Sequence, residues 1–266
     1  MSFVGDARLY QLGAQLRGEV QGPERLNQAL RDEDDLDEFY HLFGHECCYA
    51  QVWARDGLSR LDRALATFSM IATLGPNSGT LRVHVRGAMR CGCTRAQLRQ
   101  VLAMVTWYAG VPVGQQATET VRAALKDLPD AEARQPQAAT ASPSAPADML
   151  ARGRELRARV LGEPRPEAAA TDTQQAHERM LDSHYFGLLW SNTDLSLKQR
   201  CLVLLGVMCG SNRLHDAEMW FGAALRLGHR PEELDEVVLA AGAYCGELTY
   251  SRARQALASA LSTPAG

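Results

Sequence analysis

The chain has 266 residues, of which 46% are hydrophobic and 22% charged, with a formal net charge of −3. This composition is typical of a soluble globular protein long enough for two domains, and it gives no reason to expect nucleic acid or an anionic membrane as partner. No stretch approaches the ~18 apolar residues of a transmembrane helix, and the start MSFVGDARLY lacks the basic and apolar regions of a signal peptide. Seven cysteines without a disulfide-like spacing favour a reducing, cytoplasmic location.

The first half of the chain is predicted to be helical throughout. Apolar residues at helical spacing predict helices over residues 7–22, 38–53, 59–74, 79–90 and 94–110, and a last one ending near 126. In the first of these helices the expected inward stripe is Leu9, Leu12, Leu16 and Val20. Ser59 and Thr94 are the expected N-caps, and Gly92 is expected in a left-handed turn. The acidic run at 32–37 is expected to be a solvated turn.

The second half repeats the first after a segment with almost nothing to bury. Residues 128–148 are rich in Ala, Pro and Ser, which predicts a flexible linker between one domain at 1–127 and another at 149–266. The pattern Gly-x-x-Leu-Arg-x-x-Val-x-Gly occurs at 13–22 and again at 153–162, while Trp190 and Arg200 follow Trp53 and Arg63 by 137 positions each. Because no strand pattern competes, we expect an all-α protein of two tandem helical bundles.

One histidine stands on a helix face that should be buried. His84 lies in register with Leu81, Val85 and Ala88, whereas the corresponding position of the second half is Trp220. A buried histidine is often a satisfied core residue. An imidazole near other polar groups can instead be poised near neutral pH for proton transfer, and histidines and Arg63 lie on neighbouring predicted helices.

Other cofactor or metal chemistry is not indicated. His41 and His45 lie one helical turn apart beside Glu46, but without a third well-placed ligand we predict no metal site. The sequence contains no phosphate-binding glycine loop, nucleophile elbow or dinucleotide fingerprint, so no organic cofactor is expected. A redox Cys-x-x-Cys pair ahead of His84 would occupy positions 77 and 80, which are Asn77 and Thr80.

Each half resembles the carboxymuconolactone decarboxylase family over about 120 residues. The resemblance rests on the Arg-x-Leu at Arg63 and Arg200 and on four longer segments, which are Gly153–Gly162, Trp53-Ala-Arg-Asp-Gly57-Leu58, Leu81-Arg-Val-His84-Val-Arg-Gly-Ala and Tyr108-Ala-Gly-Val-Pro112. It implies an all-α fold that assembles in rings, with a cofactor-free site near a subunit interface where His84 is the acid/base group. This chain departs from the family at Gln51, where a glutamate is frequent, and at Trp220. Peroxidase activity, as in the alkylhydroperoxidase D-like branch, is not expected because the Cys-x-x-Cys is missing.

We therefore predict a cofactor-independent lyase, isomerase or cyclase that acts on a small carboxylated, lactone-like or biosynthetic intermediate. His84 is the predicted catalytic residue, and Arg63 or Arg86 is expected to hold the substrate carboxylate. The other expected pocket residues are Gln51, Trp53, His45 and Tyr108, with Trp190, Arg200 and Trp220 lining the second half. Three copies would form a homo-oligomer that mimics a ring of six single units. The alternative is a non-catalytic binding or scaffold protein derived from such an enzyme.

Overall fold

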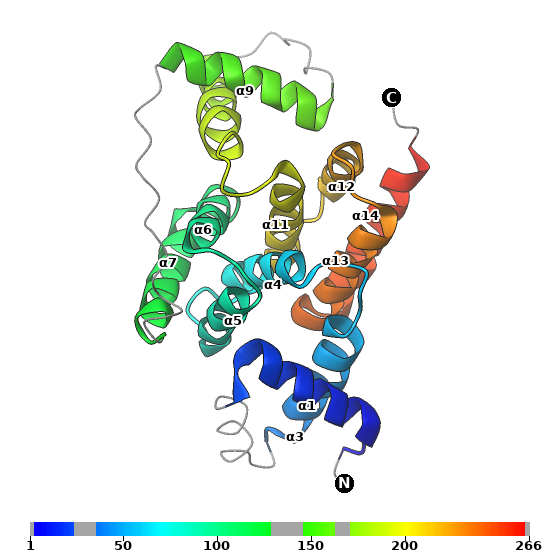
Figure 1. Ribbon diagram of the computed structural model, residues 1–266. Helices are drawn as coiled ribbons and strands as arrows, with labels where there is room; N and C mark the ends of the chain where they lie inside the picture. Colours follow the sequence, from blue (N-terminus) through cyan, green and yellow to red (C-terminus); the bar gives the residue numbers. More distant parts are fainter. Residues whose placement is uncertain (1–2, 24–35, 129–145, 163–170, 264–266) are drawn as a thin grey trace.

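The computed structural model describes residues 3–23, 36–128, 146–162 and 171–263, and it contains no β-strand within these ranges (Figure 1). The predicted all-α class is confirmed. The helices of the first half are α1 (Ala7–Gln21), α3 (Glu38–Phe43), η1 (Gly44–Trp53), α4 (Arg60–Leu74), α5 (Gly79–Arg90), α6 (Arg95–Ala109) and α7 (Val111–Lys126). Those of the second half are α9 (Pro146–Leu161), α10 (Asp172–Met180), η2 (Leu181–Trp190), α11 (Leu197–Gly210), α12 (Ala217–Arg226), α13 (Pro231–Cys245) and α14 (Glu247–Ser262).

Helix boundaries follow from local chemistry. The Ser59 side chain accepts a hydrogen bond from the backbone N–H of Asp62, and Thr94 forms a capping box with Gln97, as the N-cap predictions required. Gly92 and Gly110 have φ values of 89° and 103°, which residues with a side chain rarely adopt. The helix before each glycine therefore ends there. No helix among the described residues is long and apolar enough to cross a membrane.

The helix expected over 38–53 changes its winding partway along. Its first part is the α-helix α3, and its second part, η1, is a π-helix that ends with the backbone N–H of Ala54 donating to the Tyr49 carbonyl over 3.0 Å. Helix α1 crosses η1 so closely that a Cβ on Gly13 would collide with the His45 carbonyl. Gly153 of α9 meets the Asp182 carbonyl of η2 in the same way. His45 and Asp182 are therefore equivalent positions of the two halves.

This close crossing also decides which face of α1 is buried. Leu16 and Val20 are buried as expected, but Leu12 is 41% exposed. The buried face is centred on Gly13 and includes Arg17, because the helix rests on η1 through its glycine. The predicted apolar stripe was thus wrong at Leu12, and a charged side chain belongs to the core.

The two halves are interlocked at their centre. Helices α4 and α11 form the most extensive contact between them, and they lie together in the middle of Figure 1. Helix α13 of the second half packs on α4 and η1, while α6 of the first half packs on α11 and η2. Each half therefore completes the core of the other. Residues 129–145 of the expected linker and 32–35 of the acidic run lie outside the described residues, and α9 already begins at Pro146.

Candidate functional site around His84

His84 lies at the seam between the two halves. It is only 6% exposed on α5, and its ring meets Tyr244 of α13 edge-on with the ring centroids 5.4 Å apart. Neither ring nitrogen hydrogen-bonds to a described residue. The polar atoms that are both inaccessible to solvent and without a hydrogen-bond partner do not include either nitrogen of His84. Both nitrogens thus keep some contact with solvent. His84 is not satisfied by the backbone, as a purely structural core histidine would be.

The wall beside His84 comes from η1 and α1. The indole N–H of Trp53 donates to the Tyr244 hydroxyl over 2.8 Å, and the Tyr49 ring stacks on Trp53 at 6.0 Å between centroids. The Tyr49 hydroxyl in turn accepts a 2.6 Å hydrogen bond from the side-chain amide of Gln21. A line of buried polar groups therefore runs from His84 and Tyr244 towards α1.

Arg17 stands at the end of that line. Its Nε donates to the Gln21 side-chain oxygen over 3.1 Å, and its Nη1 contacts His41 Nδ1 at 3.1 Å and His45 Nε2 at 3.2 Å. All three side chains of the Arg17–His41–His45 cluster are more than nine-tenths buried. The two histidines that suggested a metal pair are directed at a guanidinium. No group of three or more potential metal-binding side chains occurs in the part of the chain that the structure describes.

Two buried histidines of this region, His84 and His45, have pKa values below the ordinary value of a histidine. Burial, and secondly the positive charge of Arg17, lowers the pKa of His84 to about 4. Burial, then Arg17 and then His41, lowers the pKa of His45 to about 4 as well. His84 is therefore an unprotonated imidazole in the ligand-free protein, and its pKa must rise before it can hold a proton near neutral pH.

The equivalent place in the second half is filled with aromatic rings. Trp220 stacks on Trp190 with centroids 5.4 Å apart, and Tyr108 of α6 meets Trp220 edge-on at 6.3 Å. Tyr185 packs edge-on against Tyr108 at 5.1 Å. Trp220 is 6% exposed and Trp190 1%. No titratable group takes the position of His84, so the acid/base arrangement occurs in one of the two copies.

Comparison with known proteins agrees with this duplicated architecture. The model of the carboxymuconolactone decarboxylase family matches residues 38–123 and again residues 175–260. The chain belongs to this family. It is 30% identical over 125 residues to the 4-carboxymuconolactone decarboxylase of Acinetobacter baylyi, an alignment that covers 47% of this chain and 92% of that protein. It is 29% identical over 124 residues to the nitrosuccinic acid decarboxylase of Metarhizium robertsii, with 46% and 85% covered.

In this family member the predicted arginines of the seam are engaged with protein groups. Arg63, 1% exposed, donates through Nη2 to Glu236 and to the Arg55 carbonyl, both at 3.0 Å. Arg200 donates to the Asn192 carbonyl over 2.6 Å. Arg63 joins the two halves through Glu236, and Arg200 does so through a 3.4 Å hydrogen bond from its Nη1 to the side-chain oxygen of Gln100.

The remaining predicted residues are placed unequally. Gln51 is exposed, and Arg86 is half-buried on the helix of His84. Tyr108 faces the aromatic cluster of the second half, because α6 and α13 cross to the opposite halves, and the tyrosine beside His84 is its counterpart Tyr244. Sequence reasoning also missed Arg17. Its signal was its place in the repeated Gly-x-x-x-Arg pattern.

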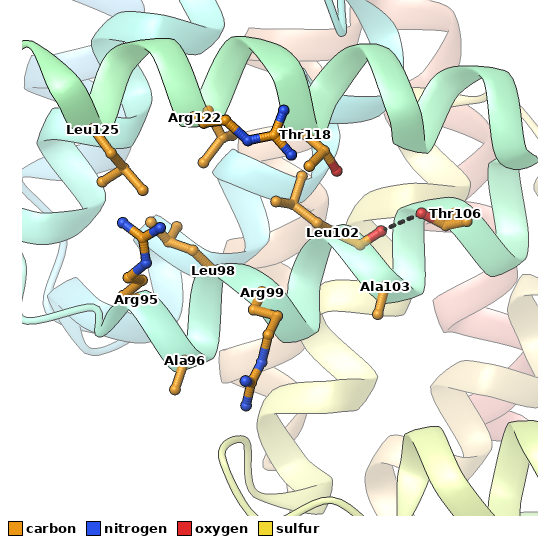
Figure 2. Close-up of a pocket in the computed structure, with 11 residues that line it drawn as sticks. Arg95, Ala96, Leu98, Arg99, Leu102, Ala103, Thr106, Thr118, Arg122 and Leu125 are labelled. Atoms are coloured by element: carbon orange, nitrogen blue, oxygen red, sulfur yellow. Dashed lines mark hydrogen bonds between the residues drawn. The ribbon is translucent and has the colours of Figure 1, made fainter. Parts of the chain in front are cut away.

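Two cavities lie away from His84. One, of about 390 Å³, lies between α6 and α7. Figure 2 shows leucine side chains in the space between these two helices, together with arginines that also line the cavity. Its lining includes Arg95, Arg99, Arg122, Leu98, Leu102 and Leu125. Arg99 pairs with Asp194 at 2.8 Å. The other, of about 270 Å³, is lined by polar residues from both halves, among them Asp62 and His229.

Proposed function

We propose that this chain is a cofactor-independent decarboxylase-type enzyme with one active site, in which His84 transfers a proton on a small carboxylated substrate. The observation that supports this most strongly is the state of His84, which is buried, neutral and without a hydrogen bond to a described residue. Such a histidine has both ring nitrogens available to a ligand. The names of the two relatives favour decarboxylation over isomerisation or cyclisation.

The chemistry needs one proton and an electron-withdrawing neighbour on the substrate. Loss of CO2 from a carboxylate leaves an electron pair on carbon, which an adjacent carbonyl, lactone or nitro group of the substrate delocalises. The carbanion then takes up one proton. His84, after taking a proton from solvent, would deliver it, and Tyr244 and Trp53 shape the wall that excludes bulk water.

Protonation of His84 becomes easier when an anion enters the site. Burial is the first cause of the low pKa of His84 and the charge of Arg17 is the second, and a bound carboxylate offsets that charge. The substrate thus brings the pKa of His84 upward, towards the range in which a histidine is an efficient general acid.

Release of CO2 from a panel of activated carboxylates tests the proposal. The panel should include 4-carboxymuconolactone and nitrosuccinate, and metal chelators should leave the rate unchanged. His84→Gln is expected to lower kcat by about 10²–10⁴-fold, the usual contribution of a general acid or base. His177→Gln, at an exposed position of α10, is the matched control and should retain full activity. Equal turnover by His84→Gln would remove His84 from the mechanism, and binding without turnover across the panel would favour a binding protein.

We also propose that three chains form a ring and that the protein acts in the cytoplasm. Exposed apolar side chains on α3 and at the start of α14, Phe39 (51%) and Leu248 (77%), are consistent with contacts between chains. Light scattering in solution tests the assembly. Three times the mass of the chain is the expected result, and a monomer would overturn it.

A further inference from the structure

We propose that Arg17 forms a subsite that binds a carboxylate which the ligand keeps through the reaction. This inference deepens the proposed function, on which it rests for the nature of the ligand. Its basis is the cluster of Arg17 with Gln21, His41 and His45, and its comparison with the same place in the second half.

Arg17 is a buried cation that has no carboxylate partner among the described residues. It is 7% exposed, and among the described residues it makes hydrogen bonds only to Gln21, His41 and His45, which carry no negative charge. It makes no ion pair with a described residue. Buried charges in proteins are normally paired, because removal from water is costly. An unpaired buried guanidinium is therefore suited to an anionic ligand.

One nitrogen of this guanidinium remains for such a ligand. Nε and Nη1 make hydrogen bonds within the protein, whereas Nη2 has no partner in the described part of the chain and is not among the buried polar atoms without a partner. Both histidines contact Nη1, and neither carries a negative charge that would neutralise the guanidinium. Arg17 is thereby positioned, and its charge is kept.

The second half shows what this cluster looks like when it serves the fold alone. Arg157, the equivalent of Arg17, pairs with Glu178 at 2.7 Å and Asp182 at 2.9 Å. These two carboxylates occupy the positions of His41 and His45. The equivalent arginines of α1 and α9 thus differ in their charge environment. Arg157 is neutralised in the half with the aromatic cluster, whereas Arg17 has no carboxylate partner among the described residues of the half with His84.

The residues between Arg17 and His84 are also more polar than their equivalents in the second half. Gln21 and Tyr49, joined by their hydrogen bond, correspond to Leu161 and Phe186. The contacts continue from Tyr49, whose ring stacks on Trp53, to Tyr244, which accepts from the Trp53 indole and meets the His84 ring. The two halves therefore differ at four equivalent positions around this arginine. The second half has two apolar and two acidic residues there, whereas the half with His84 has four polar residues without negative charge.

The carboxylate bound by Arg17 should be one that stays on the ligand. A guanidinium that paired with the departing carboxylate would stabilise the ground state and oppose loss of CO2. The geometry therefore points to a substrate with a second carboxylate besides the one that is lost. Arg17 would anchor that group and leave the reacting carbon to His84.

Isothermal titration calorimetry with succinate, and with succinamide as its uncharged analogue, tests the subsite. The wild-type chain is expected to bind succinate and not succinamide. Arg17→Gln should weaken succinate binding at least tenfold. Arg157→Gln, the same change in the second half, is the matched control and should leave the affinity unchanged.

A double variant guards against loss of folding. His41→Glu with His45→Asp gives Arg17 the partners that Arg157 has, so thermal stability should be retained or rise while succinate binding is lost. Unchanged succinate affinity in Arg17→Gln or in the folded double variant would overturn the subsite.

The subsite and the proposed function fail separately. His84→Gln should still bind succinate, because the anchor is Arg17. Binding that depends on Arg17, together with full turnover by His84→Gln, would keep the subsite and reject the role of His84.

Discussion

The indole N–H of Trp53 in the first half donates to the hydroxyl of Tyr244 in the second, over 2.8 Å. The equivalent pair, Trp190 and Tyr108, has no such bond, and its indole nitrogen and hydroxyl are both buried without a partner in the described residues. The hydrogen bond thus exists on the side where Tyr244 meets His84. It links the seam between the halves to the candidate site.

The difference between these pairs predicts unequal effects of the same mutation. Tyr244→Phe leaves the buried Trp53 N–H without an acceptor and should lower the free energy of unfolding by about 1–3 kcal/mol. Tyr108→Phe removes a hydroxyl that has no partner, so it should be neutral or slightly stabilising. Urea denaturation of both variants is the measurement. Equal destabilisation would show that the hydrogen bond at Tyr244 is not what matters.

Stability should fall on mild acidification because two histidines are buried in the neutral form. The folded-state pKa of His84 and of His45 is about 4, below the ordinary 6.5. Their contribution is therefore fully present above pH 6.5 and is lost as the pH falls towards 4. Between pH 6.5 and 5 the loss should be about 2 kcal/mol for each histidine.

Urea denaturation across this interval, with His84→Gln in parallel, checks the prediction. The variant should lose about half of the pH dependence. The interval also excludes Glu233, whose pKa is lowered to about 2 and whose contribution is lost only below its ordinary 4.5. A flat stability profile between pH 6.5 and 5 would contradict the prediction.

Placing a histidine at position 220 of the second half should not create a second active site. Trp220→His in a His84→Gln background leaves Trp190, Tyr108 and Tyr185 in place, and Arg157 remains paired with carboxylates. The double variant should show the turnover of His84→Gln alone. It should also unfold more easily, by about 2–4 kcal/mol, because the smaller ring leaves a cavity. Restored turnover would mean that position 220 alone decides where the site is.

The seam depends on one buried carboxylate. Glu236 of α13 pairs with Arg63, 1% exposed, at 3.0 Å and with Arg55, 54% exposed, at 2.7 Å. Glu236→Gln should cost about 3–5 kcal/mol, because it leaves a buried guanidinium without its counter-charge. Arg55→Gln removes only the exposed partner and should cost at most about 1 kcal/mol. Thermal and chemical denaturation compare the two, and similar losses would refute a special role for the buried pair.

The elements of the fold were predictable because their signals are local. Ser59 and Thr94 cap their helices as expected, and Gly92 and Gly110 end theirs in conformations that few other residues adopt. The duplication was also visible, since residues such as Trp53 and Trp190 recur at one spacing. His84 was recognised for a related reason, because its position on an apolar helix face follows from periodicity.

The site beyond His84 was not predictable in the same way. Tyr244 is far from His84 in sequence, and the two meet because α13 packs on the first half. Sequence reasoning instead chose Tyr108, which is in the same half as His84 but faces the other aromatic cluster. Gln51, chosen from its position in a family pattern, is exposed. A motif gives the residue but does not tell which half its helix contacts.

The sequence by itself determined an all-α, duplicated chain of the carboxymuconolactone decarboxylase family, and a histidine at position 84 that its second copy lacks. Only the tertiary structure decided that Arg17 is buried between His41 and His45 while Arg157 is paired with carboxylates. Helix propensity and periodicity depend on neighbours within a few residues. The charge state of a buried arginine depends on side chains that other helices bring to it, and those contacts arise only when the helices pack.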